Sequence, residues 1–203
     1  LIETWSVRRV GPNIMGYMLD EWVDALAPDY LNKGFVDWLS KLGRPIFNRF
    51  IADPSAGDGI YSDYDAPNKA VRHVTQDPGL RTGFWRSVGH SSNAFFKESF
   101  IDELAQSAGI DELDFRLANM KNNPRLTEAT QLVAAKAGWG KTLPEGHFHG
   151  LATHSSFGSA VAQIAEVSIK GTQIIVHKVT AAIHCGMVVN PGIVRDQVEG
   201  GII

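Results

Sequence analysis

The residues of this chain that could do chemistry gather in two short segments. The first is Arg86-Ser87-Val88-Gly89, which directly precedes an apolar periodic run. A guanidinium is permanently charged and directs several coplanar donors, and the backbone N–H groups of such a turn can approach an anionic oxygen, with glycine permitting close contact. The second segment contains Gln197, whose side-chain amide both donates and accepts hydrogen bonds. These residue types could bind a polar or anionic ligand, but on type alone Arg86 and Gln197 are better explained as parts of an ordinary loop or helix surface.

Histidine and cysteine give weaker signals. His147, His149 and His154 follow Gly146 and could in principle bind a divalent metal, but local spacing alone does not define a ligand set, so we predict no metal site. Cys185 has no adjacent base, so we expect a buried structural thiol.

Acidic residues are also interpreted as structural. Glu98, Asp102 and Glu103 fall on a predicted helix, where a solvated or helix-capping role is expected. The acidic stretch 53–65 lacks the spacing of a calcium loop and predicts a solvated loop.

Composition limits the class of protein. The chain has 203 residues, 44% of them hydrophobic and 20% charged, which is enough to bury a core in one or two domains. With 19 basic and 22 acidic residues, the net charge of -3 argues against nucleic acid as a partner. The single cysteine excludes an iron–sulfur cluster held by this chain alone. No apolar run approaches the roughly 18 residues of a membrane span, and no targeting signal is visible.

Three consecutive helices are predicted in the middle of the chain. They cover residues 93–108, 111–120 and 123–138, with Asp111 and Asn123 as N-caps. The first is indicated by an i+4 apolar row formed by Phe96, Phe100, Leu104 and Ala108.

Flanking segments complete the pattern. Alternating residues predict strands over 160–169 and 172–183, joined by a tight turn, and Asn190-Pro191 predicts the start of a last helix. Two amphipathic helical patterns over 17–42 should end at Gly43, which is followed by Pro45. Helices followed by a sheet and a helix indicate an α+β fold.

Several segments resemble one family in the correct order. They are Gly83–Ala105, Asp111–Leu117, Ala165–Ile169, Cys185–Pro191 and Gln197–Gly201. They are similar to the isoquinoline 1-oxidoreductase beta subunits, a branch of the xanthine dehydrogenase and aldehyde oxidase family, the molybdenum hydroxylases. The chain lacks a starting methionine and stops at an apolar segment, so we expect an internal fragment of such a large subunit.

The resemblance implies a domain organisation and a reaction. Residues 1–65 would be a lead-in or insertion without an assigned function, and residues 66–203 a partial molybdopterin-binding domain. The complete enzyme would hydroxylate an N-heterocycle with oxygen from water. It would use molybdenum–molybdopterin, in the cytosine dinucleotide form, with iron–sulfur clusters on a small partner subunit and a cytochrome as electron acceptor. An aldehyde-oxidising relative, or a non-catalytic binding or assembly module, remains an alternative.

The same resemblance implies roles for individual residues. Arg86 aligns with a catalytic arginine at the molybdenum site, while Ser87, Val88, Gly89 and Gln197 align with cofactor contacts. His184 departs from the family pattern, in which an aspartate is usual, and this could change a hydrogen bond that anchors the loop. The family's catalytic glutamate base lies outside this chain, so we expect the fragment alone to be inactive. Relatives imply either a periplasmic or a cytoplasmic location.

Overall fold

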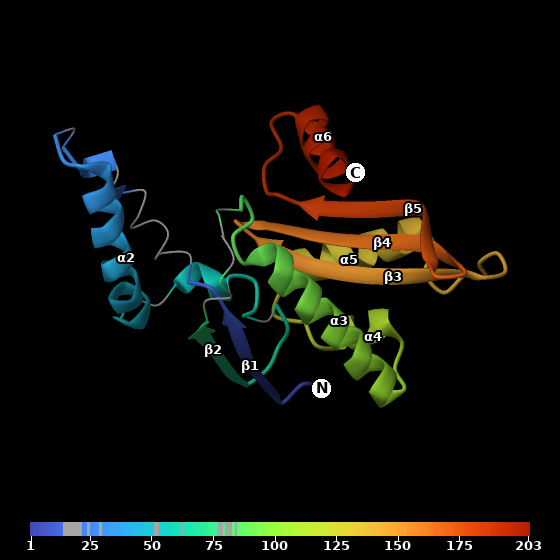
Figure 1. Ribbon diagram of the computed structural model, residues 1–203. Coiled ribbons are helices and arrows are strands. Elements are labelled where there is room, and N and C mark those ends of the chain that lie inside the picture. The colour runs from blue at the N-terminus through green and yellow to red at the C-terminus, as the bar shows by residue number, and fades with distance from the viewer. Residues whose placement is uncertain are drawn as a thin grey trace. The chain divides into compact units, whose positions relative to one another are not determined.

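The computed structural model divides into two compact units, and each is described by itself (Figure 1). Unit 1 comprises Leu1–Thr4, Ser62–Pro67 and Ala94–Ile203, and unit 2 comprises Trp5–Tyr61 and Asn68–Asn93. The structure describes residues 1–13, 22–23, 25–28, 30–50, 53–61, 63–76, 79, 83 and 85–203, without the side chains of 44 and 46–50.

Unit 1 is built on an antiparallel sheet with strand order β3-β4-β5. The strands are β3 (His147–Ser156), β4 (Ser159–Lys170) and β5 (Gln173–His184). The tight turn predicted between the last two strands is confirmed, with Gly171 at φ 63°. Strand β3 was not predicted, because its histidines and glycine interrupt the apolar alternation.

Helix α5 (Pro124–Ala137) covers one face of this sheet (Figure 1). Its predicted ends are confirmed: the Asn123 side chain accepts from Leu126 N at 3.4 Å, and Gly138 is left-handed at φ 77°. The core between helix and sheet consists of Ala129, Val133, Ala134, Leu151, Ala162, Ile164 and Ala182. These small and branched side chains let the helix pack closely on the strands.

Helix α3 (His90–Ala108) begins in unit 2 and continues into unit 1. The predicted helix is confirmed, but the apolar i+4 row that indicated it is not the buried one, since Phe96 is 55% and Phe100 is 49% exposed. The buried row is instead the neighbouring i+4 series Asn93, Lys97, Ile101 and Ala105. The polar side chains of that row, Asn93 and Lys97, can be buried because residues elsewhere in the fold supply their hydrogen-bond partners.

Two further helices complete unit 1. Helix α4 (Glu112–Ala118) is capped by Asp111 as predicted and ends two residues before the predicted end. Helix α6 (Pro191–Ile202) starts at the predicted Asn190 cap. The α+β fold class is confirmed.

Unit 2 contains a two-stranded sheet of β1 (Thr4–Gly11) and β2 (Asn68–Thr75) and the helix α2 (Lys33–Phe50). The predicted end of α2 at Gly43 is wrong, because the helix continues through Pro45. Proline removes one backbone bond to the carbonyl four residues earlier, that of Lys41, and this residue is exposed to water, which can satisfy the carbonyl. The earlier half of the 17–42 pattern lies largely outside the described residues.

The acidic stretch 53–65 is more ordered than the predicted solvated loop. A 3-10 turn, η1 (Pro54–Gly57), is capped by the Asp53 side chain, which accepts from Ser55 N at 3.0 Å. Ala56 and Ile60 are buried in unit 2, so this segment contributes to packing. Among the described residues, no helix combines the length and apolarity required to cross a membrane.

Candidate functional site

The predicted binding segment 86–89 forms a turn at the N-terminus of α3, in unit 2. Val88 N donates to Trp85 O at 2.9 Å, and His90 N donates to Ser87 O at 2.9 Å. The Ser87 and Ser91 hydroxyls are hydrogen-bonded to each other across the start of the helix. Arg86 is exposed, so its guanidinium is accessible to a ligand.

Gly89 anchors the turn against η1 and the residues after it. An added Cβ would lie 2.5 Å from Ser55 O and 3.0 Å from Asp58 O, both of them backbone atoms. Beside it, Asn93 Nδ2 donates to Ala56 O at 2.9 Å and to Asp58 O at 2.8 Å. The glycine is therefore required for close packing within the chain.

Val88 has a backbone conformation that is costly for a β-branched residue, with φ at 47°. Val88 and Gly89 also line a cavity of about 220 Å³ in unit 2, together with Trp85, Arg9 and Asp53. The strained turn thus borders an accessible space.

The turn presents hydrogen-bond donors that the described part of the chain does not use. Among the bonds of the described residues, none is donated by the backbone N–H of Arg86, Ser87 or Gly89. The turn also precedes a helix of 19 residues, whose N-terminal end carries a partial positive charge. Free N–H groups beside an exposed guanidinium fit an anionic oxygen, so the residues present are compatible with a pterin phosphate or a comparable group.

Gln197 lies on α6 in unit 1, and its side chain is exposed. The helix begins where the Asn190 side chain accepts from Gly192 N at 3.0 Å and from Ile193 N at 3.2 Å. The amide of Gln197 is thus available to an external group. The structure brings Arg86, Ser87, Val88 and Gly89 together, whereas Gln197 belongs to the other unit.

Unit 1 contains a buried polar network that the sequence did not reveal. The Glu98 carboxylate accepts from Thr153 N at 2.9 Å, from Arg116 Nε at 3.1 Å and from the Tyr64 hydroxyl at 3.0 Å. Arg116 also pairs with Asp102 through Nη1, at 2.7 Å from Oδ1. The predicted solvated role of Glu98 is therefore wrong, whereas Asp102 is half-exposed as well as paired and Glu103 is exposed as expected.

The same network changes the ionisation of its members. Burial, and then the Glu98 carboxylate, raise the pKa of Tyr64 well above its ordinary value. Burial lowers the pKa of Arg116, but Tyr64, Glu98 and Asp102 more than offset that effect and the net pKa is raised. Arg116 therefore remains a cation, and Tyr64 remains a neutral hydrogen-bond donor.

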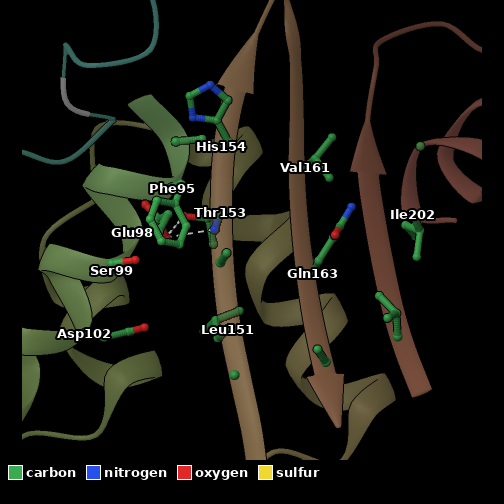
Figure 2. A pocket seen from close by; sticks show the side chains of 16 residues that line it. Phe95, Glu98, Ser99, Asp102, Leu151, Thr153, His154, Val161, Gln163 and Ile202 are labelled. Carbon is green, nitrogen blue, oxygen red and sulfur yellow. Dashed lines mark hydrogen bonds between the residues drawn. The ribbon is translucent and has the colours of Figure 1, made fainter. Parts of the chain in front are cut away.

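A cavity of about 610 Å³ lies beside this network in unit 1. Figure 2 shows Phe95, Ser99 and Asp102 of α3 on one side and Gln163 of β4 and Ile202 of α6 on the other. The walls are mostly apolar, and the half-exposed Asp102 carboxylate lies at the α3 side. No sequence pattern predicted this cavity, because its walls come from separate elements that only the tertiary fold brings together.

The histidines and the cysteine that were considered as possible ligands or nucleophiles do not form a site. His147 Nδ1 lies 2.7 Å from Glu166 Oε1, and the His147 and His177 rings stack at 4.2 Å. No group of three or more metal-ligating side chains occurs among the described residues. Cys185 is only half-buried, because it lies in the surface loop after β5, so the prediction of a buried thiol is wrong.

Comparisons with known proteins identify a family. A family model described as "Molybdopterin cofactor-binding domain" matches residues 91–203. The chain is 31% identical over 172 residues to the beta chain of isoquinoline 1-oxidoreductase from Brevundimonas diminuta, covering 82% of this chain and 22% of that protein. It is 32% identical over 160 residues to a subunit of nicotinate dehydrogenase from Pseudomonas putida, covering 70% of this chain and 13% of that protein. No solved structure matches.

The chain thus spans only 22% and 13% of the lengths of these two relatives. The matched segment begins at Ser91, in the first turn of α3, and includes the Gln197 helix. Since this match covers more than half of the chain, the chain belongs to the molybdopterin cofactor-binding domain family of the molybdenum hydroxylases.

Proposed function

We propose that this chain is part of the molybdopterin-binding subunit of an enzyme that hydroxylates N-heterocyclic aromatics with oxygen from water. The observation that carries the proposal is the turn at Arg86–Gly89, immediately before the family-matched segment, with an exposed guanidinium and backbone donors that the described residues do not use. The names of both relatives, isoquinoline and nicotinate, refer to aromatic rings that contain nitrogen.

The residues of this chain would bind and orient the cofactor and the substrate. The N–H groups of Ser87 and Gly89 would hold an anionic oxygen of the cofactor, and the Arg86 guanidinium would stabilise negative charge that develops as the substrate carbon is attacked. The Gln197 amide would donate to and accept from the cofactor's polar edge. When bound, molybdenum–molybdopterin supplies the two-electron oxidation.

The complete enzyme would contain further components. The cofactor would be the cytosine dinucleotide form, and a small subunit would carry the iron–sulfur clusters, with a cytochrome as electron acceptor. The glutamate base would come from a segment outside residues 1–203. The resemblance implies a periplasmic or a cytoplasmic location for this assembly.

The test uses the full-length gene product, coexpressed with its small subunit. Turnover is measured on isoquinoline, nicotinate and benzaldehyde in ¹⁸O-labelled water, with the molybdenum content determined in parallel. We expect labelled hydroxylated heterocycle as the fastest product. Faster benzaldehyde oxidation would replace the proposal with an aldehyde oxidase, and a protein without molybdenum or turnover would replace it with a binding module.

Arg86→Gln tests the arginine in the same assay. We expect kcat to fall about a hundredfold with the molybdenum content unchanged, the size of effect seen when one transition-state donor is removed. Arg8→Gln is the matched control, since it removes an exposed guanidinium from β1 in the same unit. Equal turnover of the two variants would remove Arg86 from the catalytic machinery.

A further inference from the structure

Two hydrogen bonds join the first turn of α5 to the end of β5. Arg125 Nε donates to His184 Nδ1 at 2.9 Å, and Arg125 Nη2 donates to the His184 carbonyl at 3.2 Å. Arginine has five N–H donors and no acceptor, so Nδ1 of His184 must carry a lone pair. His184 is therefore the neutral tautomer with its proton on Nε2.

This geometry shows what His184 does at the position where the resemblance implies an aspartate. A histidine can donate where an aspartate only accepts, but here His184 accepts from a cation, as a carboxylate would. In this chain the hydrogen bond from Arg125 depends on the protonation state of the His184 imidazole.

The pair also holds the loop that follows. Gly186 N approaches the same Nδ1 at 3.4 Å, with Gly186 in a left-handed conformation at φ 79°. A Cβ at Gly186 would lie 4.0 Å from Arg125 Nη2. The start of the 185–190 loop therefore folds back onto Arg125 and His184.

Helix α6 follows this loop directly. None of its residues is fully buried, and its packing in unit 1 is confined to one half-buried row, Val194, Val198 and Ile202. In Figure 1 the loop is the connection between the end of β5 and α6. Fixing the start of the loop is thus one restraint on where the Gln197 side chain points, beside the packing of that half-buried row.

We propose that Arg125 and His184 are positioning residues that hold the 185–190 loop and α6, and with them Gln197, only while His184 is neutral. The link to cofactor binding rests on the proposed function of Gln197; the clasp itself, the pair of hydrogen bonds from Arg125 to His184, does not.

The charges around His184 explain why protonation of its imidazole would break the hydrogen bond from Arg125. Arg125 comes from α5, near the positive end of that helix dipole, and β4 contributes the uncharged Ala160 opposite His184. Arg125 is the only charged group among the described residues that hydrogen-bond to His184. A proton on Nδ1 would place two cations and two donors face to face, which breaks the bond.

Hydrogen exchange measured by mass spectrometry on the full-length protein tests the clasp. Peptides covering residues 185–194 are followed at about pH 8 and about pH 5, the range in which imidazoles ordinarily titrate, with intrinsic exchange rates corrected. In the wild type we expect protection to fall about tenfold at the lower pH, the size of one lost hydrogen bond to a charged group.

Three variants give distinct outcomes. His184→Asp retains an acceptor that stays ionised across this range, so its protection should be high and independent of pH. His184→Leu should be unprotected at both pH values. His177→Leu removes an exposed histidine from the same strand and should behave as the wild type. Protection in His184→Leu, or the same pH dependence in His184→Asp as in the wild type, would overturn the clasp.

Hydrogen exchange tests the clasp, and molybdenum content tests the proposed cofactor role of Gln197, so the two can fail separately. If Gln197→Ala leaves the molybdenum content and turnover unchanged, Gln197 has no cofactor role, yet the exchange results still decide the clasp. If His184→Leu leaves exchange unchanged while Gln197→Ala loses molybdenum, the clasp is wrong and the cofactor role stands.

Discussion

Arg116 and Glu98 form a buried ion pair between α4 and α3, with Nε 3.1 Å from Oε2 and side chains 0% and 6% exposed. The same carboxylate accepts from Thr153 N of β3 at 2.9 Å. One side chain on α3 therefore connects a neighbouring helix and a strand of the central sheet, and α3 leads directly from the candidate cofactor turn.

Replacing Glu98 should destabilise unit 1. In Glu98→Gln an amide N–H₂ would face groups that already donate, and Arg116 would lose a buried counter-charge. Breaking such a pair by changing one partner costs about 3–5 kcal/mol in the free energy of unfolding. Denaturant unfolding measures this loss. Glu103→Gln, on the exposed side of the same helix, should change it by less than about 0.5 kcal/mol, and equal stability of the two variants would contradict the assignment.

Tyr64 should make stability decline at alkaline pH. Burial and the Glu98 carboxylate raise its pKa in the folded state above that in the unfolded state. The neutral phenol thus stabilises the fold fully below the unfolded pKa, near 10, and this contribution is lost as the pH rises through the folded pKa. The free energy of unfolding, measured from about pH 8 to pH 11, should fall less steeply in Tyr64→Phe than in the wild type.

Tyr61→Phe is the control for that series, since it removes an exposed phenol. Its pH profile should match that of the wild type. If Tyr64→Phe also matched the wild type, burial of the phenol would not contribute to the alkaline decline.

Gly89→Ala should destabilise the candidate cofactor turn. Its Cβ would approach the backbone oxygens of Ser55 and Asp58 to 2.5 and 3.0 Å, and backbone atoms cannot move aside as a side chain does. Overpacking of this kind costs about 1–3 kcal/mol, and proteolysis within the turn should accelerate. Gly83→Ala provides the comparison, because a Cβ there meets no atom within 4 Å. If both variants unfolded alike, the close approach at Gly89 would be unimportant.

Features encoded within a few residues were predictable. The caps at Asp111, Asn123 and Asn190 and the turn at Gly171 each depend on one side chain or one backbone conformation, and all four are confirmed. The turn at 86–89 was singled out through the family resemblance, and its role as a binding site stays a prediction.

Features that depend on distant partners were not predictable. Helix α3 carries two competing i+4 rows, and hydrophobicity favours the one with Phe96 and Phe100. The structure buries the other row, because Lys97 pairs with Asp63, 34 residues away, and the adjacent Glu98 pairs with Arg116, 18 residues away. A periodicity argument that considers one helix at a time cannot include such ion pairs.

The connection between β3 and β4 gives a last prediction. Phe157 and Gly158 both have positive φ, 46° and 79°, the pattern of a type I′ hairpin turn, which favours Asn-Gly. Phe157 is 75% exposed, and a positive φ is costly for a bulky side chain. Phe157→Asn should therefore raise the free energy of unfolding by up to about 1 kcal/mol, measured by denaturant unfolding. Phe148→Asn, at a 54% exposed strand position with no positive φ, should lower it instead, because asparagine disfavours strands. A loss of stability in Phe157→Asn equal to that in Phe148→Asn would mean that the ring's contacts outweigh the strain of the turn.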